Sequence, residues 1–235
     1  MGAYRVYGRF YDATQSPSLL RHYVYLLRRY HPKARSLLEI ACGTGANLAP
    51  LSRRYEVAGL DISTVMLRIA RKKLPRVEFY RQDMARFRLG RKFDAIVCPY
   101  DSINHLLSFS DWTRTFKAAR THLTDGGAFI FDMNTRYKLK ALSQGPAWVD
   151  EFNGNFLIMN VIDAGRGIAG WDTKIFERSG RAGYRLHHEI IKETSFPVGR
   201  VMSALRRDFA FVRALDMETR SRPSRTSRRV VFVCK

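Results

Sequence analysis

The sequence has few cysteines, few acidic residues and no long apolar run. Its 235 residues include three cysteines, Cys42, Cys98 and Cys234, which lie far apart and form no CxxC pair. Neither a disulfide framework nor a zinc knuckle is therefore expected, and a reducing cytoplasm is the expected setting. No apolar run approaches the roughly 18 residues that a spanning helix needs, and the opening residues lack the apolar stretch of a signal peptide.

Acidic residues are scarce relative to basic ones. The 21 Asp and Glu face 41 Lys and Arg, which gives a formal net charge of +20. Such a surface attracts polyanions without selecting among them, so nucleic acid, anionic membranes and phosphorylated metabolites all stay open as partners. The basic residues are spread through every helix, and no recognised RNA-binding module is appended at either end, so nucleic acid is not favoured. With 46% hydrophobic residues, a disordered chain is excluded.

Strand-like and helix-like segments alternate through about residue 132. Helical spacing of apolar residues predicts helices over 17–30, 46–54 and 111–123, and another helix that Ser63 caps. Apolar runs predict strands over 36–41, 55–61, 76–83, 92–101 and 128–134, the last after a turn at 125–127. Repeated strand–helix–strand units imply an α/β fold whose parallel sheet has helices on both faces.

The pattern changes after the fifth strand. Residues 152–196 alternate with period two, contain many glycines and include no good helix, so they predict antiparallel strands. We interpret this segment as a sheet inserted into a single domain of residues 1–235. A helix over 198–207 and strands over 209–217 and 228–234 complete the chain. Residues 219–229, which include five arginines, are predicted to form a solvated loop between those strands.

The segment Glu39-Ile40-Ala41-Cys42-Gly43-Thr44-Gly45 is the most informative motif, because it ends a strand with an acid and two spaced glycines. Glycine permits a tight turn and close approach of a ligand to the backbone. A dinucleotide site would need a third glycine, where this chain has Leu48. Glu39 is also an awkward neighbour for a pyrophosphate, whereas it suits a cationic amino group. A ligand with an amino-acid end and no phosphate therefore fits better.

LLEIACGTG resembles motif I of the class I S-adenosylmethionine-dependent methyltransferases. The resemblance continues in order over about residues 10–134. It implies a Rossmann-like, seven-stranded, mostly parallel sheet and S-adenosyl-L-methionine as cofactor. By its position, Asp61 matches the acid that takes the ribose hydroxyls, and Asp83-Met84 matches the pair that meets the adenine. The cofactor-binding residues that the resemblance implies are Tyr11, Glu39, Ala41, Gly43, Gly45, Asp61, Ile62, Met66, Asp83, Met84, Pro99 and Tyr100.

Within the family, the chain is most similar to small-molecule enzymes. SLLEIACGTG, GLDIS and QDMARFRLGRKFDAIVCPYDSINHL resemble the amino-sugar N,N-dimethyltransferases of macrolide pathways. The chain also resembles uncharacterised bacterial members with the same inserted sheet, and FDMNTRYKLKAL is closer to these. In the sugar enzymes a histidine at the place of His105 faces the substrate, which makes His105 the first candidate for a general base. Tyr11 is the second candidate.

Each catalytic candidate has a structural alternative. His105 is flanked by leucine and is equally consistent with a packed side chain, and Tyr11 with an aromatic staple for the N-terminal helix. No metal site is expected, because His187 and His188 are adjacent strand residues and point to opposite faces. Pro99-Tyr100 lacks the leading amide or acid and the second proline of DNA adenine methyltransferases, which weakens a flipped-base interpretation.

Three functions remain open from the sequence. The first is a methyltransferase acting on an N or O nucleophile of a small molecule, with residues 152–196 covering the acceptor side. The second is a nucleic-acid methyltransferase, which the charge of +20 supports. The third is a protein that binds S-adenosylmethionine without catalysis, because binding motifs do not prove turnover.

Overall fold

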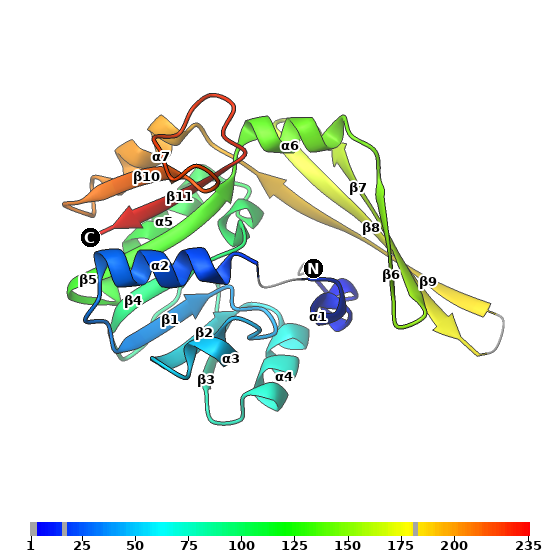
Figure 1. Ribbon diagram of the computed structural model, residues 1–235, viewed down its shortest axis with the longest axis horizontal. Coiled ribbons are helices and arrows are strands. Elements are labelled where there is room, and N and C mark those ends of the chain that lie inside the picture. The colour runs from blue at the N-terminus through cyan, green and yellow to red at the C-terminus, as the bar shows by residue number, and fades with distance from the viewer. Residues whose placement is uncertain (1–3, 16–17, 181–182) are drawn as a thin grey trace.

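The computed structural model describes residues 4–15, 18–180 and 183–235, which form two separate sheets (Figure 1). The larger sheet has the order β10-β11-β5-β4-β1-β2-β3, and its first five strands in the chain run parallel. Strand β11 pairs antiparallel with β5 and with β10. The predicted seven-stranded, mostly parallel sheet is therefore confirmed. Its strands are β1 (Ser36–Ile40), β2 (Glu56–Asp61), β3 (Glu78–Arg81), β4 (Phe93–Cys98), β5 (Leu123–Asn134), β10 (Val212–Asp216) and β11 (Arg229–Cys234).

Helices cover both faces of this sheet, as its strands require, because they are apolar on both sides. On one face Leu27, Leu48 and Leu67 pack against the sheet, and on the other Trp112 and Leu205 do so. The helices of the first face are α2 (Leu20–Tyr30), α3 (Leu48–Leu51) and α4 (Thr64–Lys73), and those of the second are α5 (Phe109–Thr121) and α7 (Val198–Leu205). None of the described helices is both long and apolar enough to cross a membrane.

The smaller sheet extends away from the larger one and has the order β6-β7-β8-β9, all antiparallel. This confirms the predicted antiparallel sheet, although it begins at Trp148 and contains a strand that was not predicted. Its strands are β6 (Trp148–Phe152), β7 (Asn155–Asp163), β8 (Ile168–Ser179) and β9 (Gly183–Thr194). Helix α6 (Arg136–Ser143) packs Leu139 against Val161 and Ala169 of this sheet.

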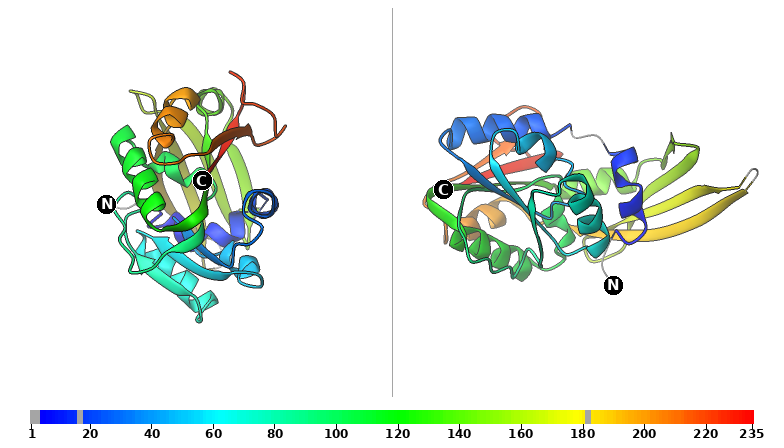
Figure 2. Two further views of the ribbon diagram at one scale, coloured as in Figure 1. Left: turned by 90° about the vertical axis from the view of Figure 1, so that its left-hand side faces the viewer. Right: turned by 90° about the horizontal axis from the view of Figure 1, so that it is seen from below.

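The N-terminal segment lies between the two sheets (Figure 2). It contains a 3-10 turn, η1 (Tyr7–Arg9), and a short helix, α1 (Tyr11–Thr14). Tyr7 packs in a small core with Phe152, Leu157 and Ile175 of the second sheet. Tyr7 thus joins the N-terminal segment to the second sheet.

Four predictions from the pattern need correction. The predicted turn at 125–127 lies inside β5, where the pairing with β4 shifts register and Gly126 has φ +73°. The predicted helix over 46–54 shortens to Leu48–Leu51, and helix α6 was not predicted. The helix predicted over 17–30 begins at Leu20, and Pro17 lies outside the described residues. Arg229 is not solvated, because it pairs with Asp101 and Asp132.

Candidate cofactor and acceptor site

The motif residues meet at the carboxyl ends of β1 and β4, the neighbouring strands at which the strand order reverses. Open α/β sheets bind ligands in the crevice at such a point. Two adjoining cavities lie there, with volumes of about 290 Å³ and 60 Å³, and they share five lining residues. Every predicted cofactor residue except Gly45 lines one or both cavities: Tyr11, Glu39, Ala41, Gly43, Asp61, Ile62, Met66, Asp83, Met84, Pro99 and Tyr100.

The loop after β1 depends on glycine for its shape. Gly43 and Gly45 have φ values of +55° and +73°, in the left-handed region that side chains disfavour. A Cβ on Gly45 would also stand 3.3 Å from Leu74 and 3.4 Å from Ala70, so this glycine lets the loop pack against α4. Gly45 therefore shapes the loop without lining a cavity, whereas Gly43 lines both.

Glu39 is a buried acid with an unused oxygen. Its side chain is 1% exposed, and its Oε1 accepts a hydrogen bond from Asn47 Nδ2 at 2.9 Å. Its Oε2 is buried and has no hydrogen-bond partner among the described residues. Burial raises the pKa of Glu39 to about 8, an effect that Asn47 opposes and Asp61 adds to. An acid in this state fits a ligand that brings a cationic amino group.

Asp61 ends β2 on the opposite side of the loop. Its Oδ2 accepts from Gly43 N at 2.8 Å and its Oδ1 from Ser63 N at 2.7 Å. Burial raises the pKa of Asp61, and those two backbone hydrogen bonds oppose the rise. Further along the same cavity, Asp83 lies beside the apolar side chain of Met84. An acid at a strand end followed by apolar walls can hold the hydroxyls and ring of a nucleoside.

A strained turn follows β4. Tyr100 and Asp101 have φ values of +59° and +51°, which non-glycine residues rarely adopt. Both of their backbone N–H groups donate to the carboxylate of Asp132, at 2.9 Å and 3.0 Å. Asp132 lies on β5, is fully buried and also binds Arg229 and the hydroxyl of Tyr23. The buried carboxylate thus fixes the turn that presents Tyr100 to the cavities.

The N-terminal segment is anchored at both ends over the site. Asp12 of α1 accepts from Thr44 Oγ1 at 2.5 Å and pairs with Lys73 of α4 at 2.6 Å. On the other side, Glu189 of β9 accepts from the backbone N–H groups of Val6 and Tyr7, at 3.2 Å and 3.1 Å. These contacts place Tyr11 where it lines both cavities just described.

A third cavity, of about 330 Å³, lies between the two sheets. It shares Tyr4, Tyr11 and Tyr100 with the 290 Å³ cavity, so three tyrosines form the boundary between them. Beyond these residues it is lined by tryptophans and by charged side chains. This larger space is the candidate acceptor cavity, on the side of the boundary away from the motif residues.

The two predicted catalytic residues lie at this boundary. His105 Nε2 is hydrogen-bonded to the Tyr4 hydroxyl at 3.1 Å, and its Nδ1 lies 3.3 Å from Lys192 O. Burial lowers the pKa of His105, and burial raises the pKa of the Tyr11 hydroxyl. His105 lines the 290 Å³ cavity but not the acceptor cavity, so it faces the acceptor side only through Tyr4. Its role as a base stays a prediction.

The sequence did not single out most of the acceptor cavity's polar residues. They come from β5, α6, β9 and β11, and no motif in the sequence joins them. The segment FDMNTRYKLKAL, which resembles that of the bacterial members, contains two of them. These residues are Asn134, Lys138, Glu193 and Arg229.

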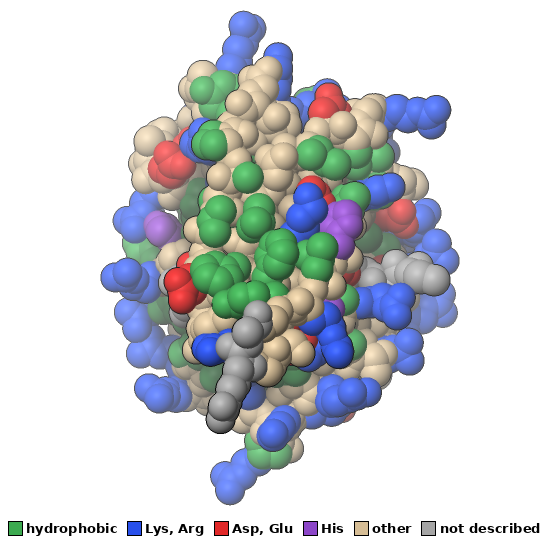
Figure 3. Space-filling view, turned by 90° about the vertical axis from the view of Figure 1, so that its right-hand side faces the viewer, with side chains coloured by type: hydrophobic (Ala, Val, Ile, Leu, Met, Phe, Trp, Pro, Cys, Tyr) green, Lys and Arg blue, Asp and Glu red, His purple; other side chains and the backbone are tan. Residues whose placement is uncertain are grey.

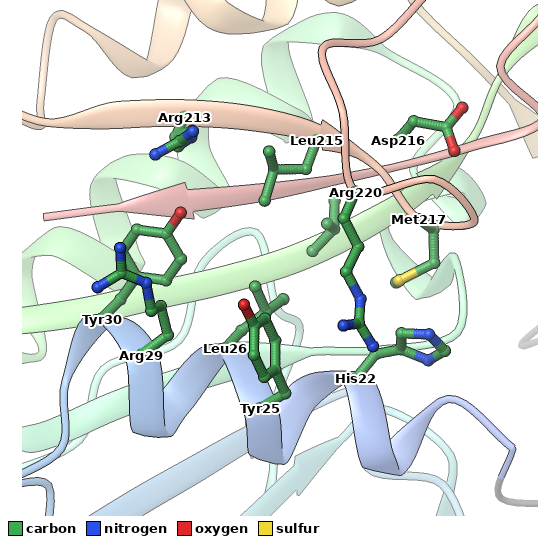
Figure 4. Close-up of a pocket in the computed structure, with 11 residues that line it drawn as sticks. His22, Tyr25, Leu26, Arg29, Tyr30, Arg213, Leu215, Asp216, Met217 and Arg220 are labelled. Atoms are coloured by element: carbon green, nitrogen blue, oxygen red, sulfur yellow. The ribbon is translucent and has the colours of Figure 1, made fainter.

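Another groove, of about 190 Å³, lies between α2 and β10 and contains none of the motif residues (Figure 4). Arg29, Arg213 and Arg220 line it, and the Arg220 guanidinium lies 4.6 Å from the centre of the Tyr25 ring. Among the described residues, none of these arginines forms an ion pair. This groove is a basic surface feature and not the cofactor site.

Comparisons with known proteins agree with this geometry. Residues 37–127 match a family model described as a methyltransferase domain. The dTDP-3-amino-3,6-dideoxy-alpha-D-glucopyranose N,N-dimethyltransferase of Streptomyces fradiae is 33% identical over 142 residues, which are 60% of this chain and 51% of that protein. The chain spans about half the length of this relative and of two other sugar N,N-dimethyltransferases that it matches.

Solved structures match over nearly the whole chain. Streptomyces venezuelae DesVI superposes with a TM-score of 0.83 at 25% identity, covering 100% of this chain and 98% of that one. The sugar N-methyltransferase KedS8 from Streptoalloteichus superposes with a TM-score of 0.82 at 26% identity, covering 98% and 92%. In its matched domain over residues 37–127, its sheet order and the glycine loop between Glu39 and Asp61, the chain is similar to the class I S-adenosylmethionine-dependent methyltransferases.

Proposed function

We propose that this chain transfers a methyl group from S-adenosylmethionine to an amino nitrogen of a small, sugar-like acceptor. The names of the Streptomyces fradiae relative and of KedS8 support an amino-sugar acceptor. The observation that carries the proposal is the unpartnered Oε2 of buried Glu39, which lies in the cavity that adjoins the Asp61 cavity. A carboxylate there matches the amino group at the amino-acid end of S-adenosylmethionine.

The residues of the site would divide the work as follows. Glu39 holds the amino group, Asp61 takes the ribose hydroxyls, and Asp83 with Met84 meets the adenine. When bound, S-adenosylmethionine supplies a methyl group on a positively charged sulfur. Tyr4, Tyr11 and Tyr100 stand between the cofactor and acceptor cavities, so they can align donor and acceptor and exclude water. Such alignment can contribute roughly 7–11 kcal/mol to lowering the barrier.

The second sheet covers the acceptor side in this proposal, as part of one domain with the larger sheet. Met159, Thr173 and Ile191 of that sheet line the acceptor cavity. Its side chains would therefore select the acceptor, whereas the larger sheet binds the cofactor. The three cysteines are all free and buried, which is consistent with a cytoplasmic setting.

The proposal is tested in two steps. Calorimetry should detect binding of S-adenosylhomocysteine in the absence of nucleic acid. Mass spectrometry should then detect methylated product from dTDP-3-amino-3,6-dideoxy-alpha-D-glucopyranose or from other sugars in a panel of primary amines. If S-adenosylhomocysteine does not bind, the assignment of the cofactor cavity is wrong. If it binds but no amine, hydroxyl or phenol acceptor is methylated, the non-catalytic alternative is favoured.

A further inference from the structure

The acceptor cavity is lined by charged residues of both signs, and one of its acids lacks a cation of its own. Asp101 and Glu193 line it together with two cations, Arg229 and Lys138, and the buried carboxylate of Asp132, which does not line it, also binds Arg229. Arg229 serves two of the acids, since its Nη1 lies 2.5 Å from Asp101 Oδ1 and also pairs with Asp132. One carboxyl group is therefore left without a cation of its own.

That carboxyl group belongs to Glu193. It is 3% exposed, and its Oε2 accepts a hydrogen bond from Asn134 Nδ2 at 3.1 Å. The same amide group donates to Asp101 Oδ2 at 2.8 Å, so Asn134 joins the two acids. Lys138 donates to Asn134 Oδ1 at 2.7 Å and forms no ion pair with a described acid. Glu193 is thus a buried acid that forms no ion pair with a described cation.

The surroundings of Glu193 indicate what kind of ligand completes it. Trp171 and Trp148 line the same cavity, with their ring centres 5.7 Å apart, and offer apolar faces. The indole N–H of Trp171 is buried beside Glu193 and lowers the pKa of that acid. Aromatic faces and a buried acid lacking a cation together suit a polar ring that carries an amino group.

We propose that Glu193 binds the amino group of the acceptor and accepts its proton before methyl transfer. The proposal rests on the proposed methyltransferase function and extends it, because it makes the acceptor cavity selective for amines over hydroxyls. An ammonium group bound to the Glu193 carboxylate gives this acid the cation that it lacks in the empty cavity. A hydroxyl acceptor would supply none.

The proton step balances as follows. An N–H bond of the ammonium breaks and its electron pair stays on nitrogen, while an O–H bond forms on Glu193. The neutral nitrogen then has the lone pair that attack on a methyl group requires. Burial raises the pKa of Glu193, and the neighbouring Asp101 raises it further, so this acid accepts a proton more readily than an exposed glutamate does. Tyr4, Lys138 and Arg229 are the other titratable groups that face this part of the cavity.

Glu193 suits this role better than His105 does. Both nitrogens of the His105 ring already have neighbours, Tyr4 and the Lys192 carbonyl, and the ring does not line the acceptor cavity. Glu193 lines that cavity, and its charge raises the pKa of the Tyr4 hydroxyl at the boundary. His105 therefore positions Tyr4, while Glu193 meets the acceptor.

Calorimetry on the protein saturated with S-adenosylhomocysteine tests the inference. The probes are dTDP-3-amino-3,6-dideoxy-alpha-D-glucopyranose and the same compound with a hydroxyl in place of the amine. The unmodified protein should bind the amine at least about tenfold more tightly, a difference of about 1.4 kcal/mol. Glu193→Gln should reduce that ratio to near one, and Glu151→Gln, an exposed acid of β6, should leave it unchanged.

A proton count gives a second readout that needs no variant. Burial raises the pKa of Glu193, which favours a proton on the empty acid, and the amine arrives as an ammonium, whereas the bound pair shares one proton, so binding of the amine should release protons. Comparing binding heats in two buffers of different ionisation enthalpy measures this release. Release with the amine but not with the hydroxyl compound supports the proposal even if Glu193→Gln fails to fold, and no release with the amine overturns it.

The outcomes separate this inference from the proposed function. Equal binding of amine and hydroxyl by the unmodified protein, or binding of neither, overturns the role of Glu193. A Glu193→Gln variant that keeps its melting temperature, its S-adenosylhomocysteine affinity and its tenfold preference for the amine overturns it as well. Failure of the unmodified protein to bind S-adenosylhomocysteine instead overturns the proposed function.

Discussion

At the residue scale, the buried acid Glu39 can favour ligand binding because its ionised form lacks a cation in the empty protein. Its unpartnered oxygen and 1% exposure make the ionised form costly in the empty protein. A cationic group from the ligand would remove that cost. The same residue therefore destabilises the empty fold at higher pH and favours the complex.

This gives a pH prediction for stability. The pKa of Glu39 is about 8 in the folded chain, above its ordinary value of 4.5, so the unfolded chain loses this proton first as pH rises. Its contribution to stability is complete below about pH 4.5 and is lost as pH rises towards 8. Between pH 5 and pH 9 the free energy of unfolding of the unmodified protein should fall by roughly 2–5 kcal/mol because of Glu39, and Glu39→Gln should abolish that fall. Urea unfolding at the two pH values measures it, and an identical pH dependence in both proteins would contradict it.

Two substitutions test the cofactor loop directly. Gly43→Val places a branched side chain at a φ of +55°, and Asp61→Ala removes the carboxylate that holds the Gly43 N–H. Each should weaken binding of S-adenosylmethionine at least about tenfold, or about 1.4 kcal/mol. Calorimetry checks both, with Ser52→Ala on α3's exposed end as a control that should not change affinity. Unchanged affinity in both variants would mean that the cofactor does not bind at this loop.

Several residues that line the candidate cofactor cavities could be singled out from the sequence because they lie at strand ends. Glu39, Asp61 and Asp83 lie at or just after the carboxyl ends of β1, β2 and β3, and parallel strands place these ends at one edge of the sheet. Asn134 and Glu193 meet only because β9 of the second sheet returns to β5, 59 residues away along the chain. Hydrophobic periodicity predicts strands, but it does not predict which face of one sheet meets another. The acceptor residues therefore required the structure.

At the scale of elements, the turn after β4 depends on a neighbouring strand. Its two residues with left-handed backbone, Tyr100 and Asp101, are not glycines, so this conformation is strained. Asp132 of β5 accepts hydrogen bonds from both of their N–H groups. Arg229 of β11 neutralises Asp132 from the next strand. This contact could not be predicted from the sequence, since an arginine in an arginine-rich segment is expected to be solvated. Three strands thus cooperate to shape one wall of the site.

Asp132→Asn tests that dependence. The variant keeps one oxygen for the two N–H groups and leaves Arg229 with Asp101 alone, so it should lower the free energy of unfolding by roughly 3 kcal/mol. Urea unfolding measures the loss. Glu56→Gln is the matched control, because the Glu56–Arg91 pair is 2.7 Å long but the Glu56 side chain is 70% exposed. That change should cost less than about 1 kcal/mol. Equal losses in the two variants would argue against a structural role for Asp132.

At the scale of the whole molecule, the excess of positive charge is a property of the surface and not of the site. The acceptor cavity holds acids and bases together, whereas Lys and Arg surround the hydrophobic centre of the end shown in Figure 3. In the groove with Arg29, Arg213 and Arg220, basic residues gather that form no ion pair within the described part of the chain (Figure 4). Polyanions should therefore bind around the periphery and not in the methyl-transfer site.

Salt dependence separates these two kinds of binding. Affinity for a random-sequence RNA should fall by about 10²–10³ between 50 and 300 mM salt, because binding that uses phosphate contacts releases counterions. The kcat for methylation of a saturating amino sugar should change by less than about twofold, since the buried site is little screened. Arg213→Glu should lower RNA affinity at low salt and leave that kcat unchanged, because Arg213 lines the groove and none of the three cavities of the site. Methyl transfer into RNA that persists at 300 mM salt would instead favour a nucleic-acid methyltransferase, with the basic surface as part of its substrate site.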